Sequence, residues 1–315
     1  MRLVDSHCHP TEEGRCYDER EREAWIQRAQ DVPLAHIAVM STDTEDQALV
    51  ARIADRYPDK VVPCFGFHPW TVHTISLHDP PPSAYEHYTE LFGDAVPEKE
   101  TLYAAWPTPI SLAAALRQLE AYLSKYPHAL VGEVGVDRSF RLPWPHTHPR
   151  QLTKLQTPLA HQMVILEAQV AVACRLRRSV SMHSVRSVGP TLEFLERART
   201  WPSFATTPLV LHSCTMSAQS IQQVQRTHPN VYISFSTAVN GRQRHWKEQI
   251  QACDVSRLLC ESDRSEWSVL ADETRAVVET MQSALQMPSL EALADQLTNN
   301  FLAFACMNSS SDLTT

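Results

Sequence analysis

The chain alternates short apolar runs with longer amphipathic stretches, and it does so eight times in 315 residues. The runs are rich in β-branched and other apolar residues, as expected for strands that are buried on both faces. They cover residues 2–6, 36–41, 61–67, 129–135, 179–183, 208–212, 231–236 and 257–262. Buried strands that alternate with helices predict a parallel α/β protein.

Helical periodicity marks the stretches between the runs. Leucine recurs at positions 112, 116, 119 and 123, which places one apolar stripe on a helix over residues 111–126. Further helices are predicted over residues 21–30, 42–57, 161–178, 217–228 and 290–305. An open doubly wound sheet is the competing fold, but eight runs and only seven glycines, with no glycine-rich loop after the first run, favour a barrel. We therefore predict a single (β/α)8 TIM barrel domain over residues 1–315.

The composition limits where the protein works and what it binds. With 43% hydrophobic and 20% charged residues the chain can bury a large core, and its net charge of −8 argues against a broad basic surface for nucleic acid. An anionic substrate would need local arginines or metal ions. The eight cysteines form no C-x-x-C pair, and no signal peptide or membrane-length apolar run is visible. We expect reduced thiols, a cytoplasmic and/or nuclear location, and no membrane partner.

One segment interrupts the alternation. Residues 76–109, extending to about 110, are long and rich in proline and lie between the third run and its helix. A plain surface insertion would explain the segment. We favour a lid or rim on the catalytic face, because loops that follow barrel strands lie on that face.

Polar residues gather where the predicted strands end. The carboxyl ends of barrel strands meet on the face that carries the active site. A single histidine there is usually a packing residue, but an unpaired glutamate inside an apolar strand is costly to bury. Five strand ends supply six residues of the kinds that bind metals: His7, His9, Glu133, His183, His212 and Asp263. This set is sufficient for two divalent ions if the glutamate bridges them.

The spacing of the first two histidines is weak evidence by itself. Alternation along a strand would point His7 and His9 to one side and Cys8 to the other. A second H-x-H pair, His146 and His148, lies in a proline-flanked stretch with no strand before it, and we predict that pair to be a loop.

Seven motifs run in order through nearly the whole chain: DSHCHP, FGFHPW, GEVGVD, SMHSVR, VLHSCT, CESD and NNFLAF. The ordered set resembles the TatD-type metal-dependent DNase family of the amidohydrolase-like superfamily, and it is most similar to the eukaryotic, fungal branch. The resemblance implies a barrel with two metal ions. His7, His9 and Asp263 would hold one ion, His183 and His212 the other, and Glu133 would bridge them.

The resemblance also implies an activity. Family members cleave phosphodiester bonds of DNA, some as 3′-to-5′ exonucleases, so DNA ends or another small phosphodiester are the expected substrates. A metal-activated water would attack phosphorus, with Glu133 and Asp263 as catalytic residues and Asp263 as the proton acceptor. His68 and Arg186 are candidate substrate contacts. The two divalent ions could be Zn²⁺, Mg²⁺ or Mn²⁺.

The chain departs from the family pattern in the substrate loops. The arginine expected two residues after His183 is replaced by Val185, no glycine follows His212, and Arg264 follows Asp263. Two alternatives therefore stay open: a barrel hydrolase for an amide, ester or phosphotriester, and a scaffold protein with a vestigial site. No particular protein partner is predicted.

Two further carboxylates have open roles at this stage. Asp5 could orient a ligand histidine or cap a turn. Asp137 could reach the rim of the site or belong to a solvated loop.

Overall fold

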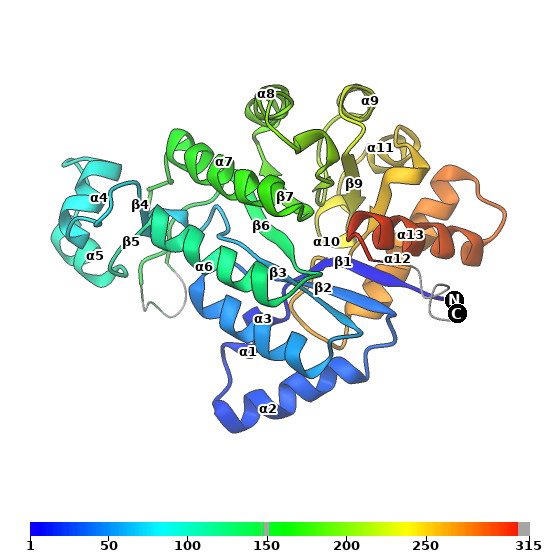
Figure 1. The fold of residues 1–315 in the computed structure, drawn as a ribbon, viewed down its shortest axis with the longest axis horizontal. Coiled ribbons are helices and arrows are strands. Elements are labelled where there is room, and N and C mark those ends of the chain that lie inside the picture. Colours follow the sequence, from blue (N-terminus) through cyan, green and yellow to red (C-terminus); the bar gives the residue numbers. More distant parts are fainter. Residues whose placement is uncertain (146, 148–150, 308–315) are drawn as a thin grey trace.

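The computed structural model describes residues 1–145, 147 and 151–307, and within them eight parallel strands form a nearly closed barrel (Figure 1). In spatial order the strands are β1 (Val4–Cys8), β2 (His36–Met40), β3 (Val61–Phe65), β6 (Leu130–Asp137), β7 (Val180–Val185), β8 (Leu209–Leu211), β9 (Val231–Phe235) and β10 (Leu258–Cys260). β10 returns to β1, where the Ser6 hydroxyl donates to the Cys260 carbonyl at 2.9 Å. Each predicted run overlaps one of these strands, so the predicted barrel is confirmed.

Helices surround the barrel. They are α1 (Thr11–Gly14), α2 (Glu19–Gln27), α3 (Thr44–Arg56), α4 (Ala84–Phe92), α5 (Lys99–Ala105), α6 (Leu112–Lys125), α7 (Leu159–Leu176), α8 (Val188–Ala198), α9 (Ala218–Thr227), α10 (Thr237–Asn240), α11 (Trp246–Gln251), α12 (Leu270–Leu285) and α13 (Leu290–Phe304). The six predicted helices are present with shifts of a few residues at their ends. The sequence reasoning did not identify α8, α11 and α12, which also belong to the ring.

Local sequence explains where the main helices begin. The side chain of Asp43 accepts hydrogen bonds from two backbone N–H groups of α3, and Ser111 and Ser217 cap α6 and α9 in the same way. Along α6 the predicted stripe is buried at Leu119 and Leu123. Each fully buried leucine contributes about 1.5–3 kcal/mol relative to an exposed one, which fixes the face that α6 turns to the barrel.

Two strands carry irregularities at the positions that matter for the site. Pairing of β1 with β2 shifts register between Asp5 and Cys8, and pairing of β6 with β7 shifts between Val131 and Val134. Such bulges redirect side chains at barrel rims. Beside the second bulge Gly135 has φ of +153°, and a Cβ there would lie 2.1 Å from the carbonyl oxygen of His183. Glycine is therefore required for the backbones of β6 and β7 to approach at this point.

Helix α7 is long and apolar enough to cross a membrane by length and composition alone. Half of it is buried inside the protein, where it packs against β6 and α6. That burial is the pattern of a core helix.

The predicted insertion begins and ends at the same place on the barrel. β4 (Ile75–Ser76) pairs in parallel with β5 (Ile110–Ser111), so the two ends of the segment lie side by side. Between them α4 and α5 lie at the edge of the molecule, at the left of Figure 1. They enclose an apolar cluster of their own that includes Tyr88, Tyr103 and Trp106.

Candidate metal centre

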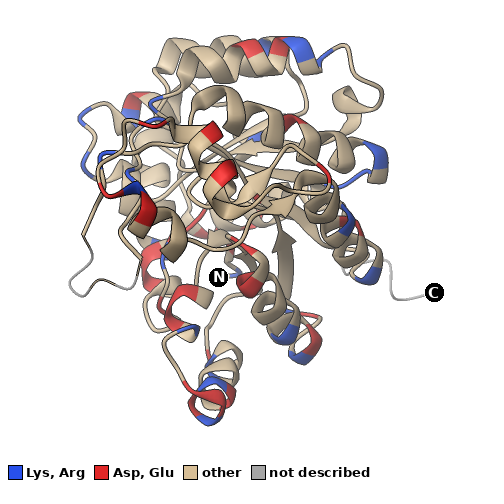
Figure 2. Ribbon diagram, turned by 90° about the vertical axis from the view of Figure 1, so that its left-hand side faces the viewer, with Lys and Arg blue, Asp and Glu red and all other residues tan. Residues whose placement is uncertain are grey.

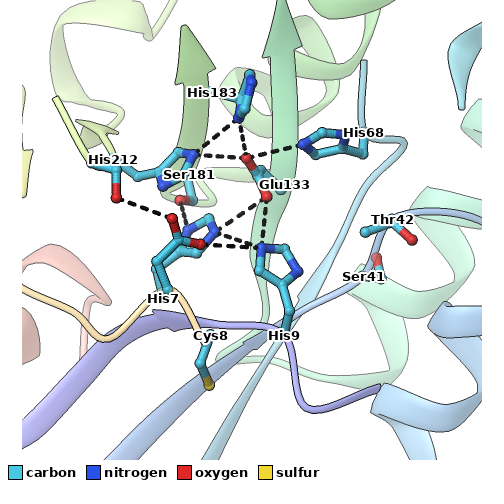
Figure 3. Close-up of polar contacts among 12 residues, drawn as sticks. His7, Cys8, His9, Ser41, Thr42, His68, Glu133, Ser181, His183 and His212 are labelled. Atoms are coloured by element: carbon cyan, nitrogen blue, oxygen red, sulfur yellow. Dashed lines mark hydrogen bonds and ion pairs between the residues drawn. The ribbon is translucent and has the colours of Figure 1, made fainter. Parts of the chain in front are cut away.

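Five of the six predicted ligand residues are labelled in Figure 3, where they come together at the carboxyl ends of the strands, and the sixth, Asp263, lies beside His7 and His9. His7 and His9 extend from the end of β1 toward Glu133 on β6, and Cys8 between them points away and donates to the Ala38 carbonyl. His183 comes from β7, and His212 follows β8. His146 and His148 lie outside the described residues.

Glu133 lies between two groups of imidazoles and presents one carboxylate oxygen to each. Its Oε2 is 3.2 Å from His7 Nε2 and 2.9 Å from His9 Nε2. Its Oε1 is 2.6 Å from His183 Nδ1, 2.7 Å from His212 Nε2 and 3.2 Å from His68 Nε2. The side chain is 1% exposed, so these nitrogens replace water around the carboxylate.

The imidazole nitrogens also face one another in pairs. His7 Nε2 and His9 Nε2 are 3.0 Å apart, and His183 Nδ1 and His212 Nε2 are 3.2 Å apart. Atoms that share one ion at metal–ligand distances of about 2.0–2.2 Å are separated by about 3.0–3.5 Å. The spacing of the paired nitrogens and of the Glu133 oxygens therefore fits two divalent ions with Glu133 between them. The assignment of individual ligands stays a prediction.

The outward ring nitrogens of His7 and His183 have hydrogen-bond partners of their own, and that of His212 faces a carboxylate. His7 Nδ1 is 2.9 Å from the Ser181 hydroxyl, and His183 Nε2 is 3.2 Å from Asp137 Oδ2. His212 Nδ1 lies 3.4 Å from Glu261 Oε1. Such outer contacts fix ring orientation and leave the other nitrogen's lone pair for a metal.

The charge of Glu133 and the protonation of the histidines around it depend on one another. Burial alone would raise the pKa of Glu133, but the surrounding histidines hold it well below its usual value, so the carboxylate is ionised. Burial opposes protonation of the rings, yet Glu133 raises the pKa of His9 to about 9 and that of His212 well above its usual value. Metal ions bound here would displace protons from these rings.

Asp263 is the least enclosed of the six residues. Its carboxylate is 16% exposed, and Oδ1 lies 3.7 Å from His9 Nε2. Its backbone has φ of 52°, and its N–H donates to the His7 carbonyl at 3.0 Å. The Ser213 hydroxyl donates to Oδ2 at 3.2 Å. This tie between β10 and β1 positions a partly solvated carboxylate beside the histidines, as the predicted proton acceptor requires.

Three buried carboxylates support the centre, and sequence reasoning left two of their roles open and missed the third. Asp137 lies inside the site next to His183, not in a solvated loop. Asp5 accepts from the backbone N–H groups of His7 and Ser262, so it ties the ends of β1 and β10 together. Glu261 was not identified, although a second glutamate in an apolar run was the same signal that marked Glu133.

The two predicted substrate contacts occupy different places. His68 is buried and belongs to the same group of neighbouring ligand atoms as Glu133 and His183. Burial lowers its pKa to about 4, so its ring is neutral. Arg186 is exposed just beyond β7 with φ of 51°.

A cleft of about 640 Å³ opens beside the centre and shares His68 and Trp70 with it. Trp70 donates its indole N–H to Asp137 Oδ2 at 2.8 Å, and its ring stacks on Phe140 with centroids 4.5 Å apart. Residues 105–108 of the insertion also line this cleft. The insertion therefore contributes to the rim of the catalytic face.

Comparison with known proteins agrees with this geometry. The family described as TatD related DNase matches residues 4–305. The Cut9-interacting protein scn1 of Schizosaccharomyces pombe is 26% identical and covers 96% of this chain and 98% of its own. The uncharacterized deoxyribonuclease YMR262W of Saccharomyces cerevisiae is 23% identical and covers 76% of this chain and 75% of its own.

Solved structures show the same fold. The TatD homologue YjjV of Escherichia coli superposes with a TM-score of 0.63 at 20% identity, covering 96% of this chain and 97% of that one. An uncharacterized amidohydrolase from S. cerevisiae superposes with a TM-score of 0.65 at 16% identity, covering 96% of this chain and 99% of that one.

Proposed function

Because the chain belongs to the family of TatD-related DNases, whose members are metal-dependent hydrolases, we propose that it cleaves phosphodiester bonds of DNA at strand ends. The observation that supports this proposal is the position of Glu133. One buried carboxylate presents a different oxygen to each of two groups of histidines, which is the arrangement that a two-ion phosphodiesterase needs.

The residues divide into two ligand sets. His7, His9 and Asp263 would hold one divalent ion, His183 and His212 the other, and Glu133 both. Zn²⁺, Mn²⁺ and Mg²⁺ are the candidate ions. When bound, they would supply Lewis acidity toward a phosphate and acidify a water molecule.

The chain's own groups then have separate tasks. Asp263 is partly exposed and close to His9, so its carboxylate is suited to accept a proton from the attacking water. His68 is neutral, its Nε2 faces Glu133 and its ring lines the cleft, so it lies where a phosphate bound at the centre would contact it. Asp137, held by Trp70, keeps the His183 ring in place.

A nuclease assay with defined metal content tests the proposal. Purified protein is loaded with Zn²⁺, Mn²⁺ or Mg²⁺, its metal content is measured by elemental analysis, and end-labelled single- and double-stranded DNA is added. We expect stepwise shortening from one end, and loss of that activity in Asp263→Asn. Asp272→Asn, an exposed aspartate on α12, is the matched control and should cleave normally. No cleavage with any ion at confirmed occupancy would refute the proposal.

Two observations support other candidates. The cleft carries more carboxylates than cations, which also suits a small uncharged ester or amide as substrate. The printed name of the S. pombe relative describes binding to another protein, so a binding role is a further candidate for this chain. Binding to a partner protein would survive Glu133→Gln, whereas hydrolytic activity would not.

The eight free cysteines support the proposed cytoplasmic and/or nuclear location.

A further inference from the structure

The charge of the cleft beside the metal centre is unsuited to a long polyanion. Among the described residues that line it, Arg15 is the single lysine or arginine, while three carboxylates come from Glu12, Asp43 and Glu45. Arg15 is already engaged, with Nε 2.5 Å from Asp46 Oδ1 and a terminal nitrogen 2.6 Å from Asp43 Oδ1. Figure 2 shows acidic and basic segments interspersed on the side of the molecule that carries the insertion.

The walls of the cleft are aromatic. Trp70 and Phe140 form a nearly parallel pair, with 8° between their planes, and both are half-buried. Trp106 contributes a third aromatic side chain from the insertion. Trp70 is also 6.3 Å from the His183 ring, measured between centroids, so the aromatic wall begins at the metal centre. A planar group stacked against this wall could therefore belong to the same nucleotide as a phosphate bound at the centre.

We propose that the cleft binds one nucleobase, that of the terminal nucleotide, by stacking and excludes the continuing phosphate backbone. Stacking on aromatic side chains needs no charge and accepts any base. The carboxylates at the cleft repel additional phosphates, so recognition is confined to a strand end. This inference rests on the proposed nuclease function and specifies its substrate as a terminal nucleotide.

Dinucleotides that differ in one base separate the inference from the function on which it rests. The substrates are thymidylyl-thymidine and its two analogues in which one or the other nucleoside is abasic, all with the same charge and the same scissile ester. We expect one of the analogues to lose about fivefold or more in kcat/KM, mainly through KM, because it lacks the stacking base. If all three substrates are cleaved equally, the inference is wrong while the nuclease function stands. If none is cleaved while end-labelled DNA is, the inference is wrong; if metal-loaded protein cleaves neither, the proposed function itself fails.

Variants locate the effect in the cleft. Phe140→Leu keeps an apolar side chain but removes one aromatic face of the wall, so it should lower kcat/KM for thymidylyl-thymidine more than for the affected abasic analogue and narrow the difference between them. Phe140→Tyr should preserve the preference. Phe92→Leu is the matched control, because Phe92 packs in the same apolar cluster and does not line the cleft. Thermal melting of each variant verifies that it is folded. A preference of unchanged size in Phe140→Leu would overturn the inference.

Chain length and salt provide an independent test. Because backbone phosphates are excluded, kcat/KM per strand end should be similar for the dinucleotide and for long oligothymidylate. The logarithm of kcat/KM should fall with the logarithm of salt concentration with a slope near −0.7, about that of one neutralised phosphate on a single strand. A severalfold gain with length, together with a steeper slope, would show that the cleft binds the backbone and would overturn the inference.

Discussion

Replacing Asp137 with asparagine should weaken metal binding without unfolding the barrel. Oδ1 of Asp137 accepts from the backbone N–H groups of Ser139 and Phe140 and from the Ser139 hydroxyl, at 2.6 to 3.0 Å. An asparagine carbonyl oxygen can keep these three bonds. The new amide nitrogen would then replace Oδ2, which faces Trp70 Nε1 at 2.8 Å and His183 Nε2 at 3.2 Å.

The magnitude follows from the acceptor that His183 loses. With Nδ1 turned toward Glu133, His183 needs an acceptor at Nε2, and the amide nitrogen is a donor. Loss of an outer-shell acceptor of this kind typically costs about 10- to 100-fold in metal affinity, which equals about 1.4–2.7 kcal/mol. Binding is measured by competition with a chromophoric chelator, and folding by circular dichroism.

Ser139→Ala is the matched control for this prediction. It removes a hydrogen bond to Asp137 on the side away from His183, so metal affinity should change little. Unchanged affinity in Asp137→Asn, or an equal loss in both variants, would show that the contact with His183 does not position a ligand.

Three further changes test other parts of the site and fold. Glu133→Gln should reduce the bound metal below two ions per chain and weaken metal affinity by more than about 100-fold. The reason is that it removes a carboxylate that would contact the ions directly, and not a partner of a ligand. Full metal occupancy by elemental analysis would contradict this prediction. Gly135→Ala should lower the free energy of unfolding, measured by urea denaturation, by about 3 kcal/mol or more, because the new Cβ would meet the His183 carbonyl. Gly189→Ala is the control: its Cβ would enter open space, so the free energy of unfolding should change by less than about 1 kcal/mol. Burial lowers the pKa of His73 to about 3. Below pH 6.5 the unfolded chain therefore binds a proton at His73 that the folded chain does not bind. The folded state loses stability relative to the unfolded state as the pH falls below 6.5, and loses none above it. At about pH 5.5 the loss is about 1.4 kcal/mol, and His73→Phe should show a smaller drop between pH 7.5 and 5.5 than the parent; an equal drop would contradict the reasoning.

The sequence by itself determined the barrel, because each strand can be recognised from a local pattern of residues. Each strand is a short apolar run buried on both faces, and each of the six predicted helices carries its own periodicity. The carboxyl ends of such strands must meet, so His7, His183 and His212 could be assigned to one face before any distance was known. Helices α8, α11 and α12 were not predicted from the sequence.

Tertiary structure decided what the ligands touch. Sequence periodicity cannot show register shifts in β1 and β6, yet these lie at His7 and Glu133. The role of Asp137 depends on Trp70, which is 67 residues earlier in the chain. The character of the cleft likewise depends on bringing residues 105–108 of the insertion against the loop after β3. Residue types and their order along strands are properties of the chain, whereas hydrogen-bond partners and the charge of a cavity arise only when distant segments pack.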